Sequence, residues 1–122
     1  MKLEIRSIHG HGKATEEYVI IDVLSDCDAK YYMVADTTYT QSGGISNKVR
    51  HTHWFYPADL KKGDVLVLHT GTGTDRSDKQ TNGATYHQRF WGLKSAVWND
   101  DGDGALLFEI NTWKTTKVAE TK

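Results

Sequence analysis

The hydrophobic pattern most constrains the fold of this chain, because no segment carries apolar residues at helical spacing. Instead there are seven or eight short runs rich in β-branched and aromatic residues. The clearest runs are residues 18–24 and 65–69, and Gly, Asp and Ser clusters of the kind found in turns separate the runs. Many short strands divided by such turns predict an all-β fold, either a sandwich or a barrel.

The expected strands can be placed along the sequence. Pro57 ends one of them, because proline cannot donate to a β-ladder. The polar stretch 70–86 has almost nothing to bury and is expected to be a long mobile or functional loop. Residues 1–113 form the predicted single domain, and 114–122 a flexible polar tail. The expected strands are residues 3–8, 18–24, 30–36, 49–56, 65–69, 87–91, 96–98 and 105–112.

The charge balance and the apolar runs limit the class of protein. Lys and Arg number 15 and Asp and Glu number 16, which gives a formal net charge of -1. A general nucleic-acid or anionic-membrane binder would carry a basic excess, so neither is expected. No run approaches the roughly 18 apolar residues of a membrane helix, and the first residues lack a signal-peptide core. A cytoplasmic location is the default expectation.

Catalytic motifs cannot be assigned from the sequence. Cys27 is the single cysteine, so no intramolecular disulfide can form. It lies between Asp26 and Asp28, whose carboxylates would raise the thiol pKa and make it a poor nucleophile. No Ser-His-Asp order, paired carboxylate set or nucleophile elbow stands out. We therefore expect a chain without enzyme activity or cofactor.

An acidic segment near the C-terminal end suggests two alternatives. Asn99, Asp101, Asp103 and the glycine after them match the first ligand positions of an EF-hand calcium loop. The twelfth position, however, is Ile110 instead of the required glutamate. The flanking residues are also β-like, which favours a hairpin whose Asp and Gly residues form the turn. Calcium binding by these three residues is the minority hypothesis.

Two His-x-His pairs, His9 with His11 and His51 with His53, suggest a transition metal such as zinc. On a strand, residues i and i+2 point to the same face, so each pair could chelate one ion. No third ligand follows at a diagnostic spacing, so packing or solvated histidines are the favoured interpretation.

Neighbouring aromatic residues indicate a binding surface. In 54–56 and 90–91 adjacent rings must face opposite sides of a sheet, so one side of each pair is either exposed or covered by loops. An exposed side would suit a carbohydrate, a peptide or a protein partner. Trp54, Arg89 and Trp91 are the candidate binding residues, together with the loop 70–86. A local basic patch for nucleic acid is the lower-ranked alternative, formed by Lys48, Arg50, Arg89 and Lys94.

Four segments in order resemble the lamin tail domain family, particularly its bacterial members. Tyr18 to Ile21 resembles the first core strand. The other matches are 32–36 (YMVAD) to an L-x-x-W-x-L-x-D segment, 54–68 (WFYPADLKKGDVLVL) to F-x-F-P-x-x-x-L-x-x-G-x-x-V-x-V, and 98–107 (WNDDGDGALL) to W-x-N-x-G-D-x-A-x-L. The tryptophan of the second pattern is absent here.

The resemblance implies an immunoglobulin-like β-sandwich of about seven to nine strands. It also implies a non-enzymatic module that binds a protein partner, and in some relatives nucleic acid. The family supplies no catalytic residues to transfer to this chain.

Overall fold

The computed structural model describes residues 1–10, 12–98 and 103–119, and these form ten β-strands and one short 3-10 helix. Most strands coincide with runs of β-branched or aromatic residues, which pack well on a pleated surface. The strands are β1 Leu3–His9, β2 Tyr18–Val23, β3 Cys27–Asp28, β4 Tyr32–Thr38, β5 Thr52–Trp54, β6 Asp59–Leu60, β7 Val65–His69, β8 Arg76–Lys79, β9 Thr85–Phe90 and β10 Asp103–Glu109, and the helix η1 is Ala29–Tyr31.

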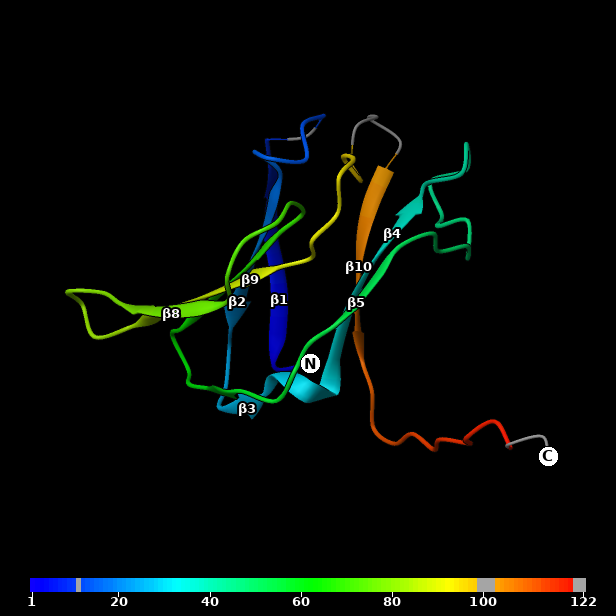
Figure 1. Cartoon of the computed structure of the whole chain (residues 1–122). Coiled ribbons are helices and arrows are strands. Elements are labelled where there is room, and N and C mark those ends of the chain that lie inside the picture. Colours follow the sequence, from blue (N-terminus) through cyan, green and yellow to red (C-terminus); the bar gives the residue numbers. More distant parts are fainter. Residues whose placement is uncertain (11, 99–102, 120–122) are drawn as a thin grey trace.

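Two sheets form the body of the molecule. A five-stranded sheet has the order β1-β2-β7-β9-β8, and a three-stranded sheet has the order β10-β4-β5. All neighbouring strands are antiparallel except β7 and β9, which are parallel. The two sheets lie on opposite sides of the body in Figure 1, and the short pair β3-β6 closes one end. This arrangement confirms the predicted fold class, an all-β sandwich.

The core lies between the two sheets. Alternate residues of β2 and β7 face inward, so Val19, Ile21, Leu66 and Leu68 are fully buried. From the opposite sheet, Tyr32 and Val34 of β4 pack into the same cluster. Ala105 and Leu107 of β10 contact its margin. Alternate residues of strands from both sheets therefore line the core.

Seven of the predicted strands occur close to their expected positions, as β1, β2, β4, β5, β7, β9 and β10. The structure has ten strands, more than the seven to nine expected, because β3 and β6 are two-residue strands between the predicted strands and β8 lies in the predicted loop. Within the described residues, no helix is long and apolar enough to span a membrane.

The predicted loop 70–86 is wrong in its middle part. Arg76–Lys79 forms β8 and pairs with β9, although none of its side chains is apolar. A tight turn joins the two strands, in which the N–H of Gln80 donates to the carbonyl of Ala84 at 2.8 Å and Gly83 adopts a φ of 89°. Pairing with β9 therefore stabilises a strand that the hydrophobic pattern of the sequence does not predict.

The predicted strand 96–98 is also wrong, and the hairpin turn predicted at 99–102 lies outside the described residues. Residues 96–98 are not in a strand, since the N–H groups of Val97 and Trp98 donate to the buried carboxylate of Glu17 at 2.7 and 3.1 Å. The indole N–H of Trp98 donates to the carbonyl of Gly104 at 3.0 Å, which joins this segment to β10.

Candidate functional site

The outer face of the three-stranded sheet carries a row of large apolar side chains. Phe108 of β10 pairs in register with Met33 of β4, and Met33 pairs with Trp54 of β5. Their chain neighbours Leu107, Tyr32 and Phe55 belong to the core or its margin, so the row faces away from it. The three side chains are therefore adjacent on a face that no described strand covers.

Two more aromatic rings extend this row. Trp113 follows β10 and meets Trp54 edge to face, with ring centroids 4.9 Å apart, and it meets Tyr31 of η1 at 5.9 Å. We call Tyr31, Met33, Trp54, Phe108 and Trp113 the aromatic cluster. The exposed fractions of its aromatic residues are 39% for Tyr31, 46% for Trp54, 37% for Phe108 and 43% for Trp113. Four large rings this exposed and this close are unusual on a monomer surface and typical of an interaction site.

Polar contacts orient two of the rings, those of Trp54 and Tyr31. The indole N–H of Trp54 donates to the carbonyl of Lys30 at 2.7 Å, which leaves the ring body at the surface. The ammonium of Lys30 lies 5.1 Å from the centroid of the Tyr31 ring, within the range of a cation–π contact. The cluster is therefore oriented by polar contacts at its edge.

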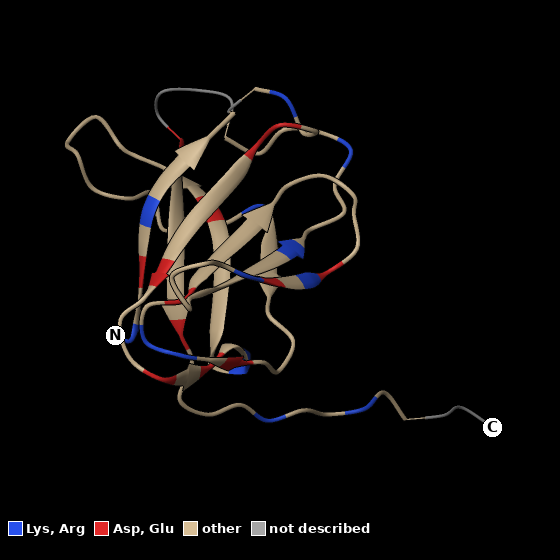
Figure 2. Cartoon of the chain, turned by 90° about the vertical axis from the view of Figure 1, so that its left-hand side faces the viewer, with Lys and Arg blue, Asp and Glu red and all other residues tan. Residues whose placement is uncertain are grey.

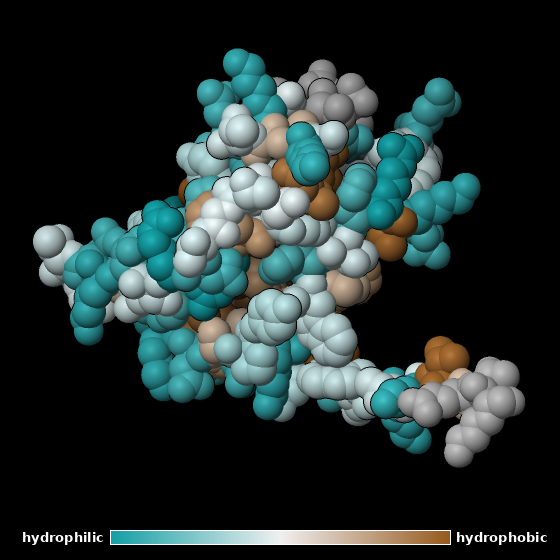
Figure 3. Space-filling model, in the orientation of Figure 1, coloured by the Kyte–Doolittle hydropathy of each residue, from teal (hydrophilic) through white to brown (hydrophobic). Residues whose placement is uncertain are grey.

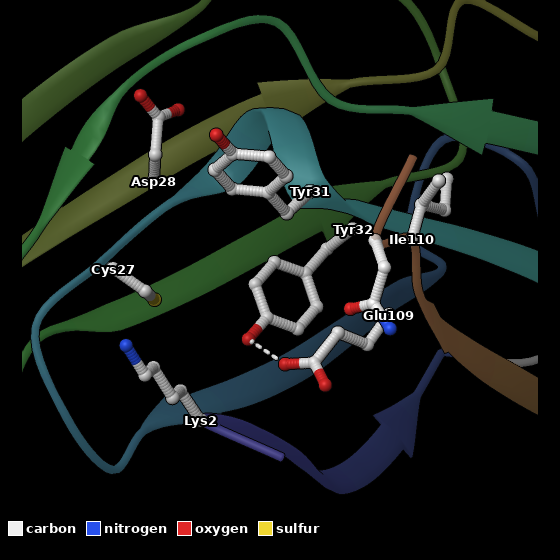
Figure 4. Close-up of a pocket in the computed structure, with 8 residues that line it drawn as sticks. Lys2, Cys27, Asp28, Tyr31, Tyr32, Glu109 and Ile110 are labelled. Atoms are coloured by element: carbon white, nitrogen blue, oxygen red, sulfur yellow. Dashed lines mark hydrogen bonds between the residues drawn. The ribbon is translucent and has the colours of Figure 1, made fainter. Parts of the chain in front are cut away.

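A pocket of about 390 Å³ adjoins the cluster at Tyr31 (Figure 4). The phenol of Tyr32 points at Glu109 and donates to its carboxylate at 2.7 Å. Burial, and then this hydrogen bond, raise the pKa of Tyr32, so the phenol stays protonated. The pocket offers cationic and anionic groups side by side, and its lining residues are Lys2, Cys27, Asp28, Tyr31, Tyr32, Glu109, Ile110 and Asn111.

The thiol of Cys27 lines the same pocket but is not activated. Burial raises its pKa, Lys2 acts in the opposite direction, and the carboxylates of Asp28, Asp26 and Glu109 raise it further. A thiol with a raised pKa is a weak nucleophile, since the thiolate is the reactive form. The pocket therefore suits binding through charge and hydrogen bonds better than covalent chemistry at sulfur.

The structure separates the three predicted binding residues. Trp54 belongs to the aromatic cluster, whereas Trp91 is half-buried and packs against Trp98 and against His53, which lies on the other side of β5. Its indole N–H donates to the carbonyl of Thr52 at 3.0 Å. Arg89 lies on β9 and donates to two backbone carbonyls. Tyr31, Phe108 and Trp113 join Trp54 instead, and their exposure followed from no sequence pattern.

The proposed metal ligands are only partly covered by the structure. Asn99 and Asp101 lie outside the described residues, as does His11, while Asp103 begins β10. Among the described residues, no three or more His, Cys, Asp and Glu side chains are grouped so that they could hold a metal ion. His51 contacts the Asp36 carboxylate at 3.2 Å, and His53 packs against aromatic rings.

The alternative basic patch is divided. Lys48 and Arg50 line one polar cleft together with the carboxylates of Asp36 and Asp103, whereas Arg89 lies on the other sheet. Lys94 is exposed in the segment after β9. Basic and acidic residues are interspersed over the described part of the face in Figure 2. This distribution does not favour a nucleic-acid surface built from these four residues.

A buried polar pair lies elsewhere in the five-stranded sheet. His87 of β9 and Asp64, just before β7, expose 7% and 6% of their surface and are 2.9 Å apart between Nε2 and Oδ2. They are 23 residues apart in the chain, so only the pairing of β7 with β9 reveals their contact.

No protein-family model matches this chain, and no curated protein is significantly similar to it. The lamin tail resemblance therefore remains a prediction from ordered motifs.

Proposed function

We propose that this chain is a binding module that contacts a protein partner through the aromatic cluster. The exposure of four large aromatic side chains in one group on the outer face of β10-β4-β5 carries this proposal. Aromatic anchors of this kind dominate the free energy of many protein–protein interfaces. The lamin tail resemblance supports the same class of function.

The orientation of the rings favours a protein over a carbohydrate. The planes of Trp54 and Trp113 meet at 88°, and those of Tyr31 and Trp113 at 55°. A sugar ring needs a flat aromatic platform, whereas perpendicular rings form a notch that accepts a protruding apolar side chain. The geometry thus suits a partner that inserts a leucine, methionine or aromatic side chain.

The surroundings of the cluster resemble the polar rim of an interface. Lys30 lies over Tyr31, and the pocket beside it presents Lys2, Asp28 and Glu109. Charged groups around an apolar centre supply register and discrimination between partners. We expect the partner to carry complementary charges around its apolar anchor.

Site-specific photo-crosslinking in cells of the source organism tests the proposal. A photoreactive phenylalanine at position 108 should crosslink to a defined protein, and one at position 79, on β8 of the other sheet, should not, although Lys79 is exposed. Adding Trp54→Ala should remove the crosslink, because loss of an anchor costs about 2 kcal/mol, roughly thirtyfold in Kd. The same proteins at both positions, or a crosslink that survives Trp54→Ala, would refute this surface.

A further inference from the structure

Three residues from separate elements form a hydrogen-bonded line in the five-stranded sheet. The His87 ring lies between them, with Nε2 2.9 Å from Oδ2 of Asp64 and Nδ1 3.0 Å from Oγ of Ser77. Asp64 and His87 are buried, whereas Ser77 is exposed on the edge strand β8. The line therefore runs from the protein interior to a hydroxyl group that solvent can reach.

The environment of Asp64 determines which ring nitrogen carries the proton. Its carboxylate also accepts the backbone N–H groups of Lys61 and Thr85, each at 3.0 Å. Burial acts to raise the pKa of Asp64, but the bonds from His87, Lys61 and Thr85 outweigh it, so the net pKa is lowered. An ionised carboxylate only accepts hydrogen bonds, so Nε2 of His87 donates to it. In the tautomer that carries its single proton on Nε2, Nδ1 has a lone pair that can accept the hydroxyl of Ser77.

The backbone holds the serine against the histidine. Ser77 of β8 and His87 of β9 are directly opposite each other in the antiparallel register. Side chains at such positions are neighbours on the same face, so their contact does not depend on a flexible loop. A serine hydroxyl in contact with an imidazole that a carboxylate orients is the arrangement of an activated nucleophile.

A positive charge lies next to the serine. Arg89 is two residues after His87, so the two side chains leave β9 on the same face. Its Nη1 donates to the carbonyl of Arg76 at 3.1 Å, and this carbonyl belongs to the peptide unit that precedes Ser77. A fixed cation beside an attacking hydroxyl stabilises negative charge that develops on an acyl oxygen. In Figure 3 hydrophilic side chains predominate at the left-hand end of the molecule, where β8 lies in the same orientation in Figure 1.

We propose that Ser77 is the nucleophile of an acyl-transfer site that hydrolyses small carboxylic esters, with His87 as general base and Asp64 as positioning residue. The Ser77 oxygen bonds to the ester carbonyl carbon while Nδ1 of His87 takes the hydroxyl proton. The carbon–oxygen bond to the alcohol breaks, and the alcohol leaves with that proton. Water, deprotonated by His87, then cleaves the acyl-serine. The products are the acid, the alcohol and the original serine.

The chain contains a natural control for this proposal. Ser7 Oγ lies 2.7 Å from Nε2 of His9 on strand β1, so it also contacts an imidazole. Within the described residues, His9 has no carboxylate hydrogen-bond partner, and its ring stacks on Tyr18. Comparing the two serines separates the effect of the buried acid from that of a nearby histidine alone.

Labelling with a fluorophosphonate tests the nucleophile directly. The serine oxygen displaces fluoride from phosphorus, and mass spectrometry of the digested full chain locates the adduct. Ser77 should be labelled about 100-fold faster than Ser7, because general-base assistance operates only at Ser77. Ser77→Ala, an exposed substitution that should preserve the fold, should remove the label and lower the hydrolysis of p-nitrophenyl acetate, whereas Ser7→Ala should hydrolyse it as fast as the wild-type chain. Equal labelling of both serines, or unchanged hydrolysis in Ser77→Ala, would overturn the proposal.

The role of Asp64 needs a measurement that a structural role alone would not change. The imidazole nitrogen shifts of His87 in NMR spectra should show the proton on Nε2 in the wild-type chain. Asp64→Asn should shift the ring toward the other tautomer and slow Ser77 labelling by about 100-fold while the fold persists. A proton found on Nδ1 in the wild-type chain contradicts the mechanism. Because the aromatic cluster lies on the other sheet, this result is independent of partner binding.

Discussion

Trp113 and Trp54 meet edge to face, with ring centroids 4.9 Å apart and planes at 88°. Trp54 belongs to β5, whereas Trp113 follows the last strand by four residues. This contact holds the first part of the C-terminal segment against the outer face of the three-stranded sheet. In Figure 1 the described residues that follow, 114–119, run away from the body.

The contact between these two indoles should be visible in circular dichroism. Two indoles this close couple their electronic transitions and give a paired signal that single rings do not give. Trp54→Phe and Trp113→Phe should therefore each remove the same component of the far-ultraviolet spectrum. The double variant should lose no more coupling than either single variant does.

Trp91→Phe, which changes the separate pair Trp91 and Trp98 at 5.8 Å, is the control and should remove a different component. Unequal losses from the first two variants would contradict the contact.

Glu17 should be among the residues most important for stability. It is 1% exposed. Its carboxylate accepts hydrogen bonds from the Thr70 hydroxyl at 2.8 Å and from the backbone N–H groups of Val97 and Trp98. Glu17→Gln replaces one acceptor oxygen by a donor that faces other donors, so we expect a loss of about 2–4 kcal/mol in the free energy of unfolding. Urea denaturation measures this loss. Glu16→Gln, at the exposed neighbouring position, should change stability by less than about 0.5 kcal/mol.

His53 should make stability depend on pH in the weakly acidic range. Burial lowers its pKa, Asp75 acts in the opposite direction, and Arg89 lowers it further. The unfolded chain therefore binds a proton at higher pH than the folded chain does, so stability rises with pH through this window and falls below about pH 6.5. His53→Gln should flatten the stability profile between about pH 7 and pH 5, with the other histidines unchanged. A profile as steep as that of the wild type would show that His53 does not contribute.

The strands that the sequence predicted most clearly are those that consist of large apolar residues. Strands β2 and β7 were evident because Val, Ile and Leu dominate them. Strand β8 reads Arg-Ser-Asp-Lys and exists because it pairs with β9, which no local pattern reveals. The segment 96–98 looks like a strand, but its N–H groups bond to a carboxylate 80 residues earlier. Tertiary contacts overrode local preference in both cases.

The candidate sites show the same limit. Trp54 was predictable, because adjacent aromatic residues on a strand must face opposite sides. Its neighbours Phe108 and Trp113 were not, since they reach Trp54 only through the sheet order β10-β4-β5. Ser77, His87 and Asp64 likewise come together through the pairing of β9 with β7 and β8. Sequence patterns indicate which side chains face outward, but not which strands become neighbours.

Asp64 should make stability fall in acid. Its pKa is lowered in the folded chain, because the hydrogen bonds it accepts outweigh the effect of burial. The resulting stabilisation is present above the unfolded value of about 3.9 and is lost as the pH falls through the folded pKa. Asp64→Asn should therefore be less stable than the wild type at neutral pH and closer to it in acid. Asp59→Asn, at an exposed carboxylate, is the control and should keep the wild-type acid dependence.

Gly10 should tolerate substitution less than other glycines with positive φ. Its φ is 63°, and a Cβ added there would lie 2.1 Å from the carbonyl oxygen of Glu16. Gly83 has a φ of 89°, but a Cβ there would meet nothing within 4 Å. Gly83→Ala should thus cost about 1 kcal/mol from backbone strain, and Gly10→Ala about 1–3 kcal/mol more from the clash. Urea denaturation of both variants checks this difference. Equal losses would mean that the turn moves away from Gly10 without cost, and that the contact with Glu16 does not hold it.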